Sequence, residues 1–152
     1  MNLVQAYRVI QAVVEERLEA ETGLCWSEVE ALMRLSASPG RRLKMIDLAE
    51  QLLVSKSGIT RLVDRLEANG LISREIPPEN RRVIYGRITE AGLQALEAAR
   101  RIFMAGLGDA FSRHLSEREV AQLRRILRKL LEGNGAWEDE RCLPAFDAPQ
   151  AD

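Results

Sequence analysis

The sequence predicts a mainly α-helical fold with one small β-hairpin. Apolar residues recur at the helical spacing i, i+3, i+4, i+7 over most of residues 1–132. A stretch rich in β-branched residues lies on both sides of a turn-forming Pro-Pro-Glu-Asn cluster at 77–80. With 152 residues, 46% of them hydrophobic, the chain is long enough to bury a core of its own.

Two helices are expected before residue 40. The first spans about residues 2–21, where apolar residues form two adjacent stripes, and Gly23 ends it. Ser27 and Glu30 have the spacing of a capping box, which predicts that the second helix begins after Ser27. The sequence Ser-Pro-Gly-Arg-Arg at 38–42 is expected to close that helix as a loop.

A helix, a tight turn and another helix are predicted next. The first helix covers about residues 45–53 and the second about 56–69, with the turn at Val54-Ser55. Gly70 supplies the stop, because glycine adopts the left-handed conformation that a C-terminal cap requires. This pair is the helix-turn-helix part of the predicted fold.

The remaining elements are a hairpin and two more helices. Residues 71–76 and 82–88 are predicted to pair across the turn cluster. A long helix is expected from about Thr89 to Leu115, and a second capping box, Ser116 with Glu119, opens the last one. Beyond it, residues 133–152 form an acidic tail that we expect to be mobile, with Trp137 or Phe146 docking on the fold and Cys142 open to intermolecular disulfides.

The charge is unevenly distributed along the chain. The net charge is −1, but residues 40–90 hold ten basic and seven acidic groups, and residues 133–152 hold one basic and five acidic groups. Because local charge governs local contacts, the overall acidity does not exclude a nucleic-acid surface in the middle of the chain.

Several classes of protein find no support. A single histidine, His114, and the absence of HExxH, GxSxG or a glycine-rich phosphate loop leave no catalytic, metal or cofactor site. Cys25 and Cys142 show no CxxC spacing, which suits a reducing cytoplasm. The N-terminus lacks a signal-peptide pattern and no 18-residue apolar run exists, so we expect a cytoplasmic protein with no membrane partner.

The second helix of the helix-turn-helix carries candidate DNA-binding residues. In DNA-binding versions of this motif that helix enters the major groove. Hydroxyls permit close approach and arginine pairs with guanine through two hydrogen bonds. A solvated helix face is the alternative interpretation, which charge and periodicity do not exclude. The candidates on its outward side are Ser55, Lys56, Ser57, Thr60, Arg61 and Arg65.

Residues 47–96 resemble the winged-helix core of the MarR family, the multiple antibiotic resistance regulators. The most specific parts are "LAEQLLVSKSGITRLVDRLEANGLI" and "RITEAG", and helix order extends the similarity to about residues 4–132. The resemblance implies one domain over residues 1–132. Its winged helix-turn-helix DNA-binding lobe would cover about 27–90, and its helical dimerisation region about 2–21 and 89–132.

The resemblance also implies a function. Members are bacterial transcription regulators, usually repressors, that bind pseudo-palindromic double-stranded DNA as homodimers. The family's wing carries an Asp-x-Arg signature, and the matching segment here is Asn80-Arg81-Arg82. Arg82 is expected to reach toward the minor groove and Arg81 toward phosphate. Asn80 accepts a hydrogen bond but forms no ion pair, which puts the rigidity of the wing in question.

Apolar surface independently favours a homodimer. The first, long and last helices have more of it than one small core can hide, and a two-fold interface would bury the rest. Packing within one chain is the alternative interpretation.

Control of DNA binding has two candidate routes. Family resemblance implies a small aromatic or anionic effector between the dimerisation helices and the lobe, where the lining would be Tyr7, Trp26, Met33, Phe103 and Met104; ordinary core packing is the alternative. Cys25, close to the start of the second helix, is a candidate redox sensor or an inert thiol. The alternative to a DNA-binding regulator is a winged-helix module that binds proteins and has no operator.

Overall fold

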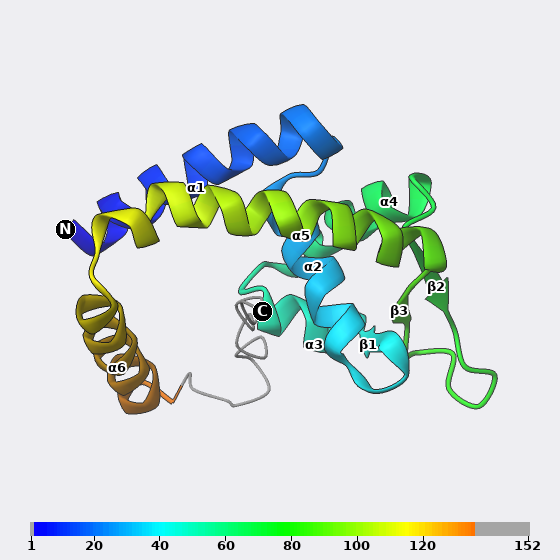
Figure 1. Ribbon diagram of the computed structural model, residues 1–152. Coiled ribbons are helices and arrows are strands. Elements are labelled where there is room, and N and C mark those ends of the chain that lie inside the picture. The colour runs from blue at the N-terminus through cyan, green and yellow to red at the C-terminus, as the bar shows by residue number, and fades with distance from the viewer. Residues whose placement is uncertain (1, 136–152) are drawn as a thin grey trace.

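Six α-helices and a three-stranded sheet make up residues 2–135, the part of the chain that the computed structural model describes (Figure 1). A mainly helical fold with a small hairpin is therefore confirmed. The helices are α1 (Asn2–Thr22), α2 (Trp26–Ala37), α3 (Met45–Gln51), α4 (Lys56–Ala68), α5 (Glu90–Ala110) and α6 (Glu117–Gly133). The strands are β1 (Arg42–Lys44), β2 (Ile72–Glu75) and β3 (Tyr85–Ile88), with 3-10 turns at Pro39–Arg41 and Ser112–His114.

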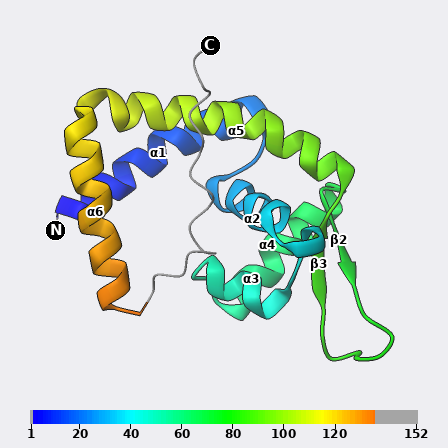
Figure 2. The same ribbon diagram turned by 60° about the horizontal axis from the view of Figure 1, so that its bottom comes forward.

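The two long helices, α1 and α5, lie side by side (Figures 1 and 2). Val14 and Leu18 of α1 are fully buried, and Gly106 of α5 faces Val14. A Cβ atom at Gly106 would lie 3.1 Å from Val14 Cγ2, so the missing side chain lets the helices approach closely. Gly106 and Gly108 both lie inside α5, which continues past them to Ala110.

A second layer under α5 contains the helix-turn-helix. Helices α2, α3 and α4 pack around one apolar core whose centre includes Leu32, Leu35, Leu48 and Leu66, all fully buried. Ile59, Leu62 and Val63 of α4 belong to the same cluster. Because these residues share one face of α4, the opposite face is left to solvent.

Helix starts and ends differ from the predictions in two places. The predicted cap at Ser27 is wrong: α2 begins at Trp26 and Cys25 is its N-cap. The Cys25 backbone N–H donates to Glu28 Oε2 at 2.9 Å, so Glu28 takes the role predicted for Glu30. The long helix was predicted to reach Leu115, but it ends at Ala110 and a 3-10 turn follows.

Other ends agree with the predictions. Ser116 caps α6 and forms the expected capping box with Glu119. Gly70, with φ of 69°, follows the end of α4. Residues 136–152, which include Trp137, Cys142 and Phe146, lie outside the described residues.

A third strand that the sequence did not predict completes the sheet. Strand β3 is central, with β2 paired antiparallel on one side and β1 on the other. β1 covers part of the segment expected to be only a loop, and the Arg42 guanidinium lies 4.8 Å from the Tyr85 ring centroid. Glu75 of β2 accepts hydrogen bonds from Arg87 and Arg42, which together lower the pKa of its carboxyl. Such a short strand has no periodicity of its own, so only pairing reveals it.

Two glycines of α5 give a test of this packing. A Cβ atom at Gly92 would lie 2.0 Å from the carbonyl oxygen of Leu71, which is backbone, whereas one at Gly108 meets nothing within 4 Å. We predict that Gly92→Ala lowers the free energy of unfolding by about 1–3 kcal/mol, because the added Cβ overpacks the site. Gly108→Ala should raise it by about 0.5–1 kcal/mol, because alanine loses less entropy in a helix. Urea unfolding followed by circular dichroism measures both, and effects of equal sign would contradict the packing described.

Candidate nucleic-acid interface

The outward face of α4 is small and polar at its N-terminal half. Ser57, Thr60 and Arg61 are exposed, and Lys56 stands at the first turn. Ser55 is the N-cap, and its Oγ accepts a hydrogen bond from the Gly58 N–H at 3.1 Å. The face predicted from the sequence is therefore the one that the core leaves exposed.

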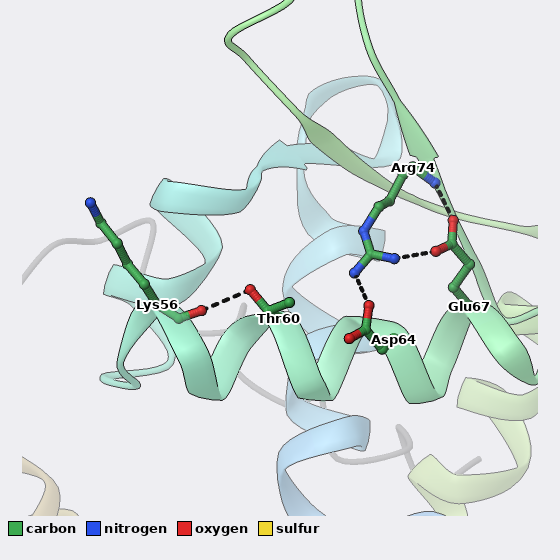
Figure 3. A network of polar contacts seen from close by, with 5 residues as sticks. All are labelled: Lys56, Thr60, Asp64, Glu67 and Arg74. Atoms are coloured by element: carbon green, nitrogen blue, oxygen red, sulfur yellow. Dashed lines mark hydrogen bonds and ion pairs between the residues drawn. The ribbon is translucent and has the colours of Figure 1, made fainter.

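The three hydroxyls of this face, those of Ser55, Ser57 and Thr60, already have partners within the helix or its cap. Ser55 Oγ lies 3.1 Å from Ser57 Oγ, and Thr60 Oγ1 donates to the Lys56 carbonyl oxygen at 2.9 Å (Figure 3). The Thr60 oxygen keeps acceptor capacity, and its methyl group remains free for apolar contact. Ser55 thus serves the helix as a cap in addition to any contact with a ligand.

An arginine from the hairpin is clamped to the middle of α4. Arg74 of β2 pairs with Asp64 and Glu67, and its backbone N–H donates to Glu67 Oε1 at 3.1 Å (Figure 3). Burial acts to lower the pKa of Arg74, but the two carboxylates raise it above its ordinary value. The clamp fixes the hairpin relative to α4 and neutralises acidic groups beside the exposed face. No motif in the sequence pointed to Arg74, because its partners are known only once β2 lies against α4.

The loop between β2 and β3 has an internal structure built on Asn80. Asn80 Oδ1 accepts from the Arg82 backbone N–H at 3.2 Å, and the Asn80 carbonyl oxygen accepts from Val83 N–H at 3.1 Å. Arg81 and Arg82 are both exposed on this loop. The hairpin extends beyond the helical lobe (Figure 2), so these arginines lie on a projecting element. The Asn80 amide oxygen therefore stabilises this turn by a hydrogen bond to the backbone, without an ion pair.

A groove joins the helix face and the wing. It has a volume of about 570 Å³ and lies between α3, α4 and the segment before β3. Lys56 and Thr60 of α4 line one part of it, and Arg82 of the wing lines another. The structure thus brings three sequence-predicted residues from two separate elements to one concave surface.

Arg65 does not join this surface. Its Nε lies 3.2 Å from Glu28 Oε1, and its Nη2 donates to Cys25 Sγ at 3.4 Å. The Glu28 side chain is only 6% exposed, so Arg65 is the cation that compensates a buried carboxylate. Arg65 therefore ties α4 to the start of α2.

Cys25 is half-buried at the N-terminus of α2. Its Sγ also lies 3.2 Å from Ser27 Oγ, and a hollow of about 280 Å³ opens beside it between Gly23 and Asn69. The contact with Arg65 links this thiol to α4. Redox sensing by Cys25 stays a prediction.

The residues predicted for an effector site lie largely in packed surroundings. Trp26 contacts Phe103 at 4.8 Å and Tyr7 at 6.4 Å between ring centroids, which joins α2, α5 and α1. Phe103 and Met33 are buried, and Met104 packs against the core. These contacts agree with the core interpretation, and the effector site stays a prediction.

No helix within residues 2–135 combines the length and apolar character needed to cross a bilayer.

Comparison with known proteins identifies the family. The MarR family model matches residues 24–84. The uncharacterised HTH-type transcriptional regulator YkoM of Bacillus subtilis is 30% identical over 132 residues, 85% of this chain and 84% of that protein. The HTH-type transcriptional repressor MdtR of the same organism is 29% identical over 144 residues, 93% of this chain and 87% of that protein.

A solved structure agrees with these sequence relatives. Sco3205, a MarR family transcriptional regulator from Streptomyces coelicolor crystallised in complex with DNA, has a TM-score of 0.80 at 26% identity. The match covers 87% of this chain and 83% of that one. The chain therefore belongs to the MarR family and is a winged helix-turn-helix, DNA-binding transcriptional regulator.

Proposed function

We propose that this protein is a homodimeric repressor that reads a pseudo-palindromic operator with α4 and grips the adjacent minor groove with its wing. The observation that carries this proposal is the shared surface on which Lys56 and Thr60 of α4 meet Arg82 of the wing. Two relatives support it: one is named a repressor and one was crystallised with DNA. The protein works in the cytoplasm, where its DNA lies.

Each residue of this surface has its own task. Exposed Arg61 is the residue that reads a base, through two hydrogen bonds to guanine. Ser57 and Thr60 are small enough to let α4 approach the base edges. Lys56 and Ser55, at the first turn, meet phosphate where the helix N-terminus also favours an anion. Phosphate contacts position the helix and base contacts set the sequence.

The wing completes the contact. Arg82 enters the minor groove and Arg81 meets phosphate, and the turn built on Asn80 holds both near the duplex. Arg65 is left out of the contact set, because its guanidinium is occupied by Glu28 and Cys25.

Exposed apolar residues on α1 and α6 support pairing of two chains. On α1, Leu3, Tyr7 and Val9 are 58%, 53% and 58% exposed. On α6, Ile126, Leu130 and Leu131 are exposed and none of its residues is buried. Figure 2 shows α6 at the end of α5 that lies far from the wing. A two-fold axis near these helices would place two copies of α4 on successive turns of one face of the duplex.

Selection from a pool of randomised duplexes tests the proposal directly. We expect the wild type to enrich an inverted repeat with half-sites about one helical turn apart. Arg61→Ala should lose preference at one base pair per half-site, worth about 1–3 kcal/mol, while the rest of the repeat persists. A wild type that retains no sequence at low salt would instead support the interaction module without an operator.

The wing makes a separate prediction about salt. Arg82→Ala should weaken operator binding roughly five- to tenfold and reduce the slope of log affinity against log salt by about 1.8, because each protomer of the dimer loses one cation and each cation contributes about 0.9. The matched control is Arg101→Ala, which removes an exposed arginine of α5 that does not line the groove. Fluorescence anisotropy at several salt concentrations measures both. Identical slopes in the two variants would remove Arg82 from the interface.

The proposed dimer predicts the mass of the protein in solution. It also predicts a substitution that should reduce this mass to that of one chain. Sedimentation equilibrium should give twice the 17.1 kDa of the single chain. Leu130→Glu should yield monomers, because a carboxylate would be buried at the interface. Leu53→Glu, at a leucine that is 87% exposed beside α3, should keep the dimer mass. A monomeric wild type at micromolar concentration would refute pairing.

A further inference from the structure

Arg65 of α4 and Glu28 of α2 form an ion pair that lies outside the proposed DNA contacts. The Arg65 Nε lies 3.2 Å from Glu28 Oε1, and the two side chains are 59% and 6% exposed. Arg65 follows Arg61, the residue proposed to read a base, by about one helical turn. This pair, the Glu28–Arg65 bridge, therefore holds α4 close to its reading residues.

Glu28 is a fixed point on α2. Its Oε2 accepts a hydrogen bond from the Cys25 backbone N–H at 2.9 Å, and its neighbour Val29 is fully buried. Both carboxylate oxygens thus have a partner within the lobe, and charge-assisted hydrogen bonds of this kind are strong and directional. Glu28 cannot follow α4 if that helix moves, so the bridge persists only while α4 keeps its place.

The bridge also keeps Arg65 within the lobe. A buried carboxylate that loses its cation is strongly disfavoured, because neither water nor another charge replaces the lost partner. The Arg65 Nη2 donates to Cys25 Sγ at 3.4 Å, which gives the guanidinium a second partner at the start of α2. A contact of Arg65 with a phosphate or a base would have to break both interactions.

The bridge restrains α4 in a way that apolar packing does not. Apolar contacts are non-directional, whereas a guanidinium presents its donors in one plane and in a fixed fork. The buried stripe of α4 selects the side of the helix that faces the core. The bridge adds a directional restraint on the position of α4 along its axis.

Helix α2 connects this restraint to the helices proposed to pair two chains. It contacts both α5 and α4 (Figure 2), and Trp26 in its first turn lies 4.8 Å from Phe103 of α5 between ring centroids. The bridge completes a path from α5 through the start of α2 to the middle of α4. In a dimer, the separation of the two copies of α4 depends on this path in each protomer.

We propose that Arg65 is a positioning residue that acts through Glu28 to set the half-site spacing that the dimer accepts. This role rests on the proposed function, because it requires paired chains that read an inverted repeat. With the bridge, α4 fits one spacing. Without it, α4 takes a range of positions, so a wrong spacing is tolerated better. The correct spacing is bound less tightly, because DNA must then immobilise a mobile helix.

Three variants remove the bridge in different ways. Arg65→Met removes the cation, and Glu28→Gln removes the anion but leaves Arg65 free to contact DNA. The double variant removes both charges and leaves no unpaired carboxylate, so it tests the proposal even if Arg65→Met does not fold. Glu28→Gln keeps an amide oxygen that can accept from the Cys25 N–H. The matched control is Arg101→Met, at an exposed arginine of α5.

Binding is measured on the operator that the wild type selects and on the same duplex with one base pair inserted at its centre. The insertion moves one half-site by about 3.4 Å and turns it by about 35°. We expect it to weaken binding of the wild type and the control by roughly 100-fold, but that of each bridge variant by roughly tenfold or less. On the selected operator, each bridge variant should bind roughly three- to tenfold more weakly than the wild type, and the double variant no more weakly than either single one.

Three results would overturn the proposal. If Glu28→Gln binds both duplexes like the wild type, Arg65 does not act through Glu28. If Arg65→Met reduces the slope of log affinity against log salt by about 1.8, Arg65 contacts phosphate directly. If the insertion costs every bridge variant as much as it costs the wild type, the bridge contributes to stability alone.

Hydrogen–deuterium exchange without DNA separates this proposal from the proposed function. We expect the backbone amides of residues 60–68 to exchange roughly threefold faster or more in the bridge variants than in the control, whereas those of α5 should not change. Equal rates in α4 would mean that the bridge does not restrain the helix, which would overturn the proposal. If the wild type selects no duplex, the proposed function fails and the spacing role fails with it, but the exchange rates still decide whether the bridge holds α4.

Discussion

Burial of one face of α4 is the constraint on which the rest of the structure depends. Ile59, Leu62, Val63 and Leu66 pack into the core shared with α2 and α3. Each buried aliphatic side chain of this size contributes about 1.5–3 kcal/mol, whereas helix propensities differ by tenths. The rotation of α4 about its axis is thereby fixed, and its hydroxyl and basic residues face solvent because no other orientation buries the stripe.

The second constraint is the position of the wing relative to α4. Arg74 joins β2 to two carboxylates on α4, and Glu75 beside it joins β2 to Arg87 of β3 and Arg42 of β1. These pairs are partly exposed, so each contributes little stability in water. Their effect is geometric: they connect α4 with all three strands, and Arg82 lines the same groove as Thr60.

The groove brings basic residues together although the chain as a whole is acidic. Lys44, Lys56 and Arg82 line it, and the basic groups of the sequence concentrate in the middle of the chain. Because local charge governs local contacts, a net charge of −1 does not exclude DNA as a partner of this surface.

The sequence by itself determined the helices, the hairpin and the outward face of α4, since periodicity and the capping box of Ser116 with Glu119 are local signals. It could not determine what depends on distant partners. Strand β1 forms only because it pairs with β3. Cys25 and not Ser27 is the N-cap of α2, because the Glu28 carboxylate accepts a hydrogen bond from the Cys25 backbone N–H. Arg65 meets Cys25 across 40 residues and Arg42 meets Glu75 across 33. Only the tertiary fold creates such neighbours, so it alone decided which arginines form ion pairs within the lobe.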